Sequence, residues 1–235
     1  MNKLLVQEEL VYLTSYFSKL LKKRFGKGPE KCFVTHDRSW FAVHVHNFAT
    51  PAEQALVEGG HNLLAYRFRS TVMDKVCSEF ALEAEKVLGA VLNVHYSDWD
   101  YDSNAGILLM GNDQAGHSDA GNRSDADSRL GEQLAERIKQ LCSDTCKTPE
   151  RLDLIPLHPN LYAVQCHGVL LPIERLLFEK GSVSILQERS AEIKQRFAAR
   201  KESFSAVFGR AVEGLFMIWD YRKDRSYILF CLKNG

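Results

Sequence analysis

Hydrophobic positions along the chain alternate between helical and strand spacing, and the same order of elements occurs twice. The first half opens with apolar residues at helical spacing, Leu10, Leu13, Phe17 and Leu20, before Gly26 and Gly28-Pro29 end the stripe. Two runs rich in β-branched and aromatic residues follow, 31–36 and 40–48, which predict a hairpin.

A short helix is predicted next, from Thr50-Pro51-Ala52-Glu53. This pattern is typical of a capping box, with Thr50 as N-cap, Pro51 at the first helical position and Glu53 closing the box. A long helix over about 62–88 and a closing hairpin over 91–98 and 106–110 complete the unit.

The second half repeats this order. A helix around 130–141, a hairpin over 152–157 and 161–169, a short helix after Pro172 with Glu174, a long helix over about 183–212 and a hairpin over 215–220 and 226–232 are predicted.

Sequence identity supports the repetition. Residues 41–60 and 162–181 share eight of twenty positions, among them Pro51/Pro172, Glu53/Glu174 and Gly60/Gly181. We interpret the chain as a tandem duplication of an α-β-β-α-α-β-β unit. Grouped hairpins and helices predict the α+β class, with an antiparallel sheet of about four strands and helices on one face of each sheet.

The domain boundaries follow from a polar stretch between the halves. Residues 111–129 contain no large apolar side chain, so we expect a flexible linker there, between a first domain at 1–110 and a second, divergent domain at 130–235. A linker of this length allows the domains to pack as a pseudo-dimer, and higher homo-oligomers stay open.

Composition narrows the class of protein. The charges of thirty basic and thirty acidic residues cancel, and this lack of a net positive charge argues against a nucleic-acid partner. No apolar run is long enough to span a membrane, and Glu8 and Glu9 interrupt the N-terminal region where a signal peptide would be apolar. We therefore expect a cytoplasmic protein without direct membrane insertion, whose six scattered cysteines are reduced.

Candidate ligand chemistry lies in the first copy. His44 and His46 alternate with valines and share one face of a strand, and His95 and Asp98 on another predicted strand could complete a metal or small-ligand site. The second copy has Gln165 in place of His44 and keeps His46 as His167. The alternative interpretation is that the histidines are polar residues at a sheet surface or contact, and no cofactor is predicted.

Two further features have both a functional and a structural interpretation. The block Trp99-Asp100-Tyr101 recurs as Trp219-Asp220-Tyr221. It indicates either a ligand pocket with aromatic walls or a strand end where Asp caps a turn. Arg67, Arg69 and Lys75 could grip an anion, but at the start of a long helix we interpret them as a solvated face.

No catalytic motif is present: the chain lacks a phosphate-binding loop, a dinucleotide fingerprint, a nucleophile elbow and a zinc-protease motif. The sequence therefore favours a protein that is not an enzyme.

The pattern resembles the MpsC-like, or YbcI-like, family. The resemblance rests on Gly26-Lys27-Gly28-Pro29, the Thr50–Gln54 segment and the strand Val91–His95, and covers nearly all of residues 7–110. It implies an accessory or regulatory protein that binds a partner in a membrane cation-translocating or inorganic-carbon uptake system. A metal or small-ligand sensor that uses the histidines of the first copy is the alternative.

Overall fold

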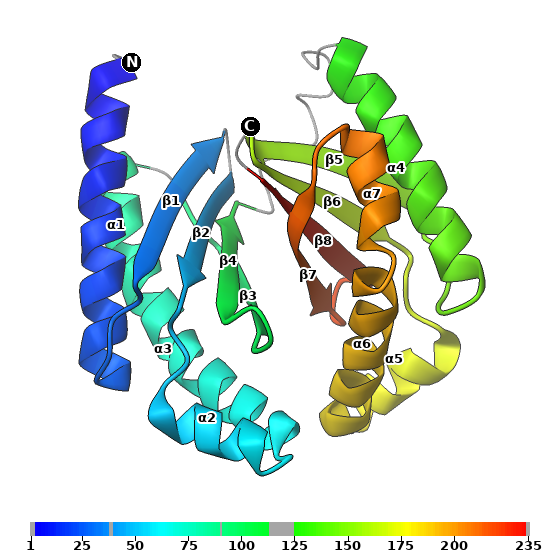
Figure 1. The fold of residues 1–235 in the computed structure, drawn as a ribbon, viewed down its shortest axis with the longest axis horizontal. Helices are drawn as coiled ribbons and strands as arrows, with labels where there is room; N and C mark the ends of the chain where they lie inside the picture. Colours follow the sequence, from blue (N-terminus) through cyan, green and yellow to red (C-terminus); the bar gives the residue numbers. More distant parts are fainter. Residues whose placement is uncertain (1–2, 38–39, 90, 113–124, 234–235) are drawn as a thin grey trace. The chain divides into compact units, whose positions relative to one another are not determined.

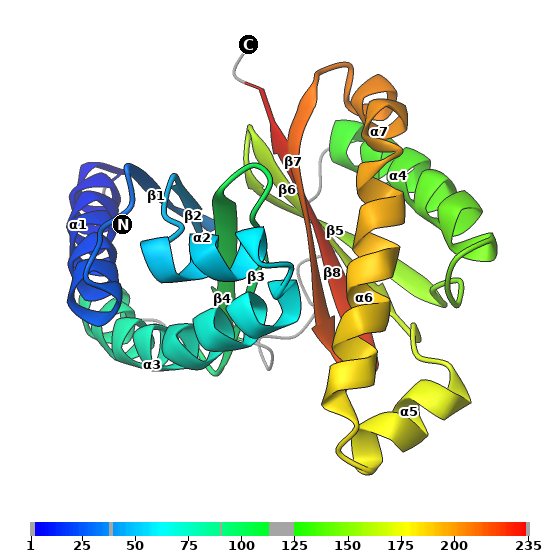
Figure 2. The ribbon, with the colours of Figure 1, turned by 60° about the horizontal axis from the view of Figure 1, so that its bottom comes forward.

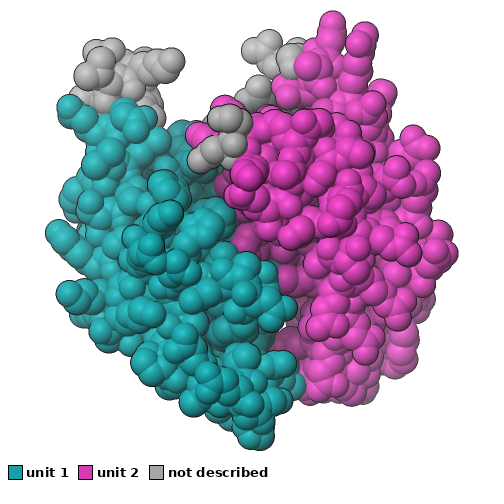
Figure 3. All heavy atoms as spheres, viewed as in Figure 1, with its two compact units in different colours: residues 1–116 teal, residues 117–235 magenta. Residues whose placement is uncertain are grey.

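A computed structural model describes residues 3–37, 40–89, 91–112 and 125–233. The chain divides into two compact units, residues 1–116 and 117–235 (Figure 3). Each unit contains a four-stranded antiparallel sheet with helices alongside, so the α+β class is confirmed (Figure 1).

Unit 1 has the strand order β1-β2-β4-β3, in which two hairpins pair through their second strands. The helices α1 and α3 pack together and cover one face of this sheet (Figure 2). Its elements are α1 (Lys3–Phe25), β1 (Lys31–Asp37), β2 (Trp40–His46), α2 (Pro51–Glu58), α3 (Asn62–Leu88), β3 (Val94–Asp100) and β4 (Ala105–Gly111).

Unit 2 has the same topology, with the strand order β5-β6-β8-β7. Its elements are α4 (Asp125–Ser143), β5 (Arg151–His158), β6 (Leu161–His167), α5 (Pro172–Glu179), α6 (Val183–Ala198), α7 (Lys201–Phe208), β7 (Val212–Asp220) and β8 (Arg225–Leu232).

The second long helix and the segment between the units differ most from the sequence prediction. The helix predicted over 183–212 is interrupted at Arg200, whose φ of −110° and ψ of 21° leave helical geometry, and it ends at Gly209, which adopts a left-handed φ of 63°. The predicted linker is shorter than 111–129, because Gly111 pairs in β4 and α4 already begins at Asp125. Asp125 and Asp127 suit the first turn of a helix, where backbone N–H groups attract negative charge; residues 113–124 lie outside the described part of the chain.

The core of unit 1 forms where the stripe of α1 meets the sheet and α3. Leu13, Phe17 and Leu21 of α1 are fully buried, and the ring of Phe17 meets that of Phe80 edge-on at 4.9 Å between centroids. Val43 and Val45 contribute from β2. The alternation along β2 therefore turns its valines toward the helices and His44 and His46 toward the opposite face.

The start of α2 is anchored by the turn between β3 and β4. Asn104 adopts a left-handed φ of 47°, and its side-chain oxygen accepts hydrogen bonds from the backbone N–H groups of Phe48 and Ala49, at 3.0 and 2.8 Å. Asp224 repeats this in unit 2, with a φ of 51° and a hydrogen bond of 2.7 Å from the Leu170 N–H. The turn thus fixes where the short helix of each unit begins.

One glycine in the sheet makes room for a tryptophan. Gly106 on β4 pairs with Trp99 on β3, and the indole lies across the glycine so closely that a β-carbon there would meet Trp99 Cε3 at 1.8 Å. In unit 2, Ser226 holds the corresponding place opposite Trp219. The glycine therefore sets the position of the Trp99 ring in unit 1.

We expect Gly106→Ala to lower the free energy of unfolding by about 1–3 kcal/mol, because the new methyl group must displace the indole from a packed core. Urea denaturation followed by tryptophan fluorescence measures the loss. Gly131→Ala in α4 is the control, because the new β-carbon would lie at an ordinary 3.6 Å from Leu154 of β5. This substitution should raise the free energy of unfolding by about 0.5–1 kcal/mol, since alanine is favoured over glycine inside a helix. Equal effects of the two substitutions would contradict this account of Gly106.

Candidate functional site

A buried ion pair between Glu53 of α2 and Arg69 of α3 lies at the centre of unit 1. Arg69 Nε and Nη2 donate to the two carboxylate oxygens of Glu53 at 2.5 and 2.6 Å. Neither residue has appreciable exposure, since Glu53 is 0% and Arg69 3% exposed. Two charges removed from water in this way are tolerated only when their geometry is good and their remaining polar atoms are satisfied.

The Glu53 carboxylate is satisfied by further donors. The Thr50 N–H and hydroxyl donate to Oε2 at 2.9 and 2.7 Å, and the Glu53 N–H donates to the Thr50 hydroxyl at 3.3 Å, so the predicted capping box is present. The Tyr101 hydroxyl adds a hydrogen bond of 3.2 Å to Oε1. Glu53 therefore caps α2, as predicted, and also joins α2 to α3 and to the end of β3.

Aromatic rings surround the Arg69 guanidinium. Its Cζ lies 3.7 Å from the ring centroid of Trp99, 4.9 Å from that of Phe48 and 5.2 Å from that of Phe25. Tyr101 completes this set at 5.9 Å. We call these four rings the aromatic cage. Ring faces attract a cation, so the cage stabilises the arginine that Glu53 holds.

Arg69 retains one unused donor. Its Nη2 also donates to the Phe48 carbonyl at 3.3 Å, whereas Nη1 is buried without a hydrogen-bond partner among the described residues. A small cavity of ≈ 20 Å³ adjoins Arg69 and is bordered by Tyr66, Ser70, Ser97 and mostly apolar side chains. That volume suits about one water molecule, so the cavity is too small for an organic ligand.

Tyr101 is held in its protonated form. Burial, together with the neighbouring charge of Glu53, raises the pKa of Tyr101 to about 12, although Arg69 opposes the change. The hydroxyl therefore stays a donor to Glu53 throughout the neutral range. Through these contacts the Glu53–Arg69 pair joins α2, α3 and the end of β3.

The sequence did not identify this pair. Arg69 was interpreted, with Arg67 and Lys75, as part of a solvated face, and it is buried instead because its position on α3 turns it inward between the rings. Sixteen residues separate Glu53 from Arg69, a spacing with no local signature. The repetition was the available signal, since Glu174 and Arg189 of unit 2 also pair.

Unit 2 contains a more open version of the same site. The Leu171 N–H donates to Glu174 at 2.7 Å, but leucine offers no side-chain acceptor, so half of the capping box is missing. The Arg189 side chain is 29% exposed. Tyr221 donates to the Leu186 carbonyl at 3.1 Å, and Trp219 stacks on Tyr221; within the described residues no ring lies over Arg189.

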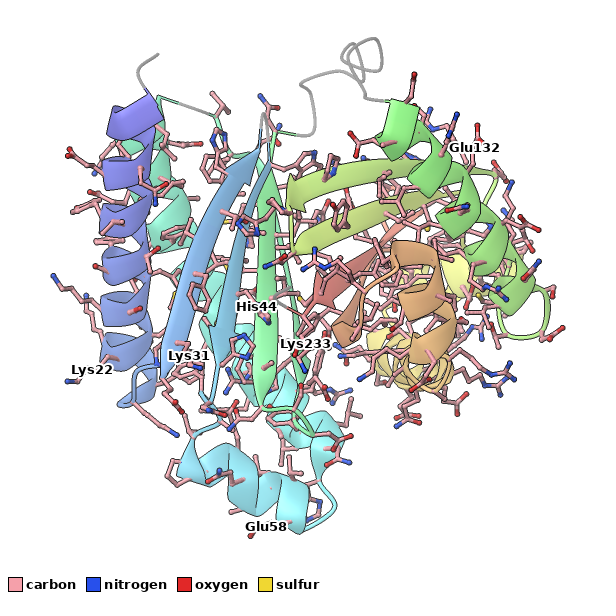
Figure 4. The ribbon with its side chains drawn as sticks, turned by 45° about the horizontal axis from the view of Figure 1, so that its top comes forward. Lys22, Lys31, His44, Glu58, Glu132 and Lys233 are labelled. Atoms are coloured by element: carbon pink, nitrogen blue, oxygen red, sulfur yellow. The ribbon has the colours of Figure 1, made fainter. Side chains whose placement is uncertain are left out.

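The predicted histidine site does not converge. His44 and His46 are neighbours, with ring centroids 4.1 Å apart, and alternate along β2 with the core residues Val43 and Val45. Figure 4 labels His44 on its strand. His95 of β3 pairs with Met110 of β4, and Met110 is a core residue. The side chain of His95 therefore lies on the helix-covered side of the sheet. In the part of the chain that the structure describes, no group of three histidine, cysteine or acidic residues could hold a metal ion.

Asp98 lies on the same face of the sheet as His44 but is too far away to share a ligand with it. Both residues pair with Ile107, from opposite sides of β4, so two strand spacings or about 10 Å separate them. Asp98 Oδ1 accepts from the Trp99 N–H at 2.8 Å. Burial, together with the neighbouring His46, lowers the pKa of His44 to about 4, so His44 is neutral at pH 7.

The remaining predicted residues lie in surface networks and turns. His167 Nε2 is 3.2 Å from an Asp153 oxygen and 3.0 Å from Arg151 Nη2. Asp100 accepts from the Asp102 N–H and the Ser103 hydroxyl, and Asp220 accepts from the Lys223 N–H at 3.2 Å. Both aspartates therefore close the turns that follow their tryptophans.

We expect Arg69→Met to destabilise unit 1 by about 3–5 kcal/mol, because it leaves the Glu53 carboxylate buried without a counter-charge. Chemical denaturation monitored by circular dichroism and by tryptophan fluorescence measures this loss. Arg189→Met is the matched control and should cost clearly less, since water reaches that site. Similar losses for both variants would show that the burial of the first pair does not set its energy.

Comparison with known proteins agrees with the first unit's pattern. Residues 10–114 match the family model described as "Na+-translocating membrane potential-generating system (MpsC)". Neither the curated proteins nor the solved structures gave a match. Within the described residues, no helix is both long and apolar enough to cross a membrane. The match covers unit 1, which contains the Glu53–Arg69 pair.

Proposed function

We propose that this chain is a non-enzymatic, cytoplasmic accessory protein that binds a membrane component of a cation-translocating system. The family match over residues 10–114 carries the proposal, since the description of that family names a Na⁺-translocating system that generates a membrane potential. The absence of catalytic motifs in the sequence and the commitment of the buried polar groups to structural contacts support a binding role.

A binding role needs a surface, and the start of α3 offers one. Leu64 and Phe68 are one helical turn apart on α3 and are 55% and 42% exposed. Exposed apolar side chains grouped on one helix face are typical of protein interaction sites. Phe68 also packs edge-on against Phe25 of the aromatic cage, 6.3 Å between centroids, which holds its ring in place.

The corresponding segment of unit 2 has the same character. Ile185 of α6 is 51% exposed, and α5 exposes Ile173 and Leu176 at 56% and 47%. The apolar exposure at the start of the second long helix is therefore common to both units, although most of the side chains differ. We further infer from this, and from the repeated Glu–Arg pair, that the chain arose by tandem duplication.

A metal sensor built on His44, His46 and His95 receives no such support, because His95 lies on the other side of the sheet. The predicted packing of the two units as a pseudo-dimer stays a prediction.

Affinity capture from detergent-solubilised membranes of the source cells tests the proposal. We expect the wild-type chain to recover an integral membrane protein of an ion-transport system. Leu64→Ser with Phe68→Ser should reduce recovery about 10-fold or more, because each exposed anchor lost from an interface costs on the order of 1–2 kcal/mol.

Leu82→Ser is the matched control, since Leu82 is 61% exposed at the other end of α3. Its recovery should equal that of the wild type. Repeated capture without any transport-related protein would contradict the proposed function, and equal losses for the control would contradict the proposed surface.

A further inference from the structure

One end of unit 2 combines exposed aliphatic side chains with exposed basic ones. It is formed by α5, the start of α6 and the turn between β7 and β8 (Figure 2). The aliphatic side chains are 38% to 56% exposed and belong to Ile173 and Leu176 of α5 and Val183 and Ile185 of α6. The exposed basic side chains are those of Arg175, Lys180, Arg222 and Lys223. We call these eight residues the unit 2 tip.

Contacts within the unit hold the β7–β8 turn against both helices. The ring of Phe178 on α5 stacks on that of Tyr221 in the turn, 5.8 Å between centroids. Arg175 of α5 pairs with Asp224 at the end of the same turn. The Tyr221 hydroxyl donates to the Leu186 carbonyl of α6 at 3.1 Å. The basic side chains of the turn and the aliphatic side chains of the helices therefore belong to one surface.

The aliphatic residues of α5 lie on the side of the helix that the unit does not bury. Glu174 is buried and Phe178, one helical turn later, is half-buried, so this side faces the unit. Ile173 and Leu176 are three residues apart and face away from it. Both lie outside the apolar core of unit 2, so the fold gains little from their size.

Unit 1 shows that the same fold forms without the tip. Alignment at Pro51/Pro172 places Ala52 and Ala55 where unit 2 has Ile173 and Leu176. The four basic positions of the tip correspond, in order, to Gln54, Gly59, Asp102 and Ser103 of unit 1. Val183 corresponds to Asn62, and only Ile185 has an aliphatic counterpart, Leu64. The tip is therefore an addition to the scaffold that the two units share.

Charge also distinguishes the two units at this end. Segments 172–188 and 221–224 of unit 2 contain four basic residues and three acidic ones, besides the buried glutamate of the ion pair. The corresponding segments of unit 1, 51–67 and 101–104, contain one basic residue and two acidic ones, besides the buried glutamate. The sign of the net charge thus changes between the units, and unit 2 has its positive charge beside exposed aliphatic side chains.

A second copy of the chain is a poor occupant for this surface. The four half-exposed aliphatic side chains offer on the order of 350 Å² of apolar surface, less than half of the ≈ 800 Å² that each partner buries in a stable complex. A twofold contact would also place the same basic side chains against each other. A lipid surface fits better, because interfacial helices bind it through a modest apolar face and basic side chains together.

We propose that the unit 2 tip binds the surface of an anionic lipid bilayer. The aliphatic side chains enter the headgroup layer, and the basic side chains meet the lipid phosphates. The chain then lies on the membrane without crossing it. This inference goes beyond the proposed protein partner, because it places a separate membrane contact on unit 2 that requires lipid alone.

Vesicle sedimentation of the full-length chain tests the proposal. We expect binding to vesicles of phosphatidylglycerol and phosphatidylcholine, and about 10-fold or more weaker binding to phosphatidylcholine alone, because the basic side chains contribute only at a negative surface. Sodium chloride should weaken the binding by screening. Dissolved glycerol phosphate should displace little protein, since it offers the headgroup charge without a surface for the aliphatic side chains.

Two variants give the tip the residues of unit 1. Arg222→Asp with Lys223→Ser should lower partition to the anionic vesicles about 10-fold or more, because it reverses the charge of the turn. Ile173→Ala with Leu176→Ala should lower it by about the same factor and should abolish the binding that persists in high salt, since apolar contacts are not screened. Circular dichroism checks that each variant keeps its fold.

Arg129→Glu with Arg200→Ser is the matched control. It changes the net charge as much as the variant of the turn does, at exposed positions near the start of α4 and just after α6. This control should bind like the wild type. Equal binding to both kinds of vesicle, no binding to either, or an equal loss in the control would overturn the proposal.

The vesicles contain no protein, so their result does not depend on the outcome of the affinity capture. Absence of vesicle binding, together with loss of the captured membrane protein in the Arg222→Asp, Lys223→Ser variant, would assign the tip to a protein partner and contradict the lipid contact.

Discussion

The Glu53–Arg69 ion pair is the interaction on which unit 1 depends, because it joins two consecutive helices to each other and to the end of a strand that follows them. Glu53 closes the cap of α2, Arg69 belongs to the first half of α3, and Tyr101 reaches the same carboxylate from the end of β3. Burying both charges costs several kcal/mol of desolvation each, so the pair is stable only with its full set of donors. The ion pair therefore depends on the aromatic cage and on the cap of α2 for its stability.

Comparison of the two units shows how one backbone position controls this arrangement. Gly106 lets the Trp99 indole lie flat across β4, where it meets the guanidinium of Arg69. Ser226 occupies that place in unit 2, and Trp219 stacks on Tyr221 instead. Val169 and Cys146 stand where unit 1 has Phe48 and Phe25. The second arginine thus keeps its carboxylate, lacks the rings and is reached by water, which turns a sealed contact into a partly open one.

The sequence predicted the fold well because local rules determine its parts. The stripe Leu13–Phe17–Leu20 predicted α1, the Thr50–Glu53 pattern predicted the cap of α2, and the alternation along 40–46 predicted β2. The site was predicted poorly because it depends on strand register and on packing between elements distant in sequence. Three residues separate His95 from Asp98, so their side chains point to opposite faces of β3, and only the pairing with β4 shows that His95 takes the face away from His44. Arg69 looked exposed for a related reason: helical position alone does not reveal a carboxylate sixteen residues away.

The divergence between the units also shows what the fold tolerates beside this ion pair. In unit 1, the space beside Arg69 is filled by Phe25, and the arginine is neutralised and sealed. In unit 2, a smaller side chain at that place leaves the positive charge of Arg189 next to a half-buried thiol. Both units keep the Glu–Arg pair, whereas only unit 1 has the threonine cap and the rings over the guanidinium. The pair therefore joins the short helix to the long one in either environment, and the rings decide whether water reaches the arginine.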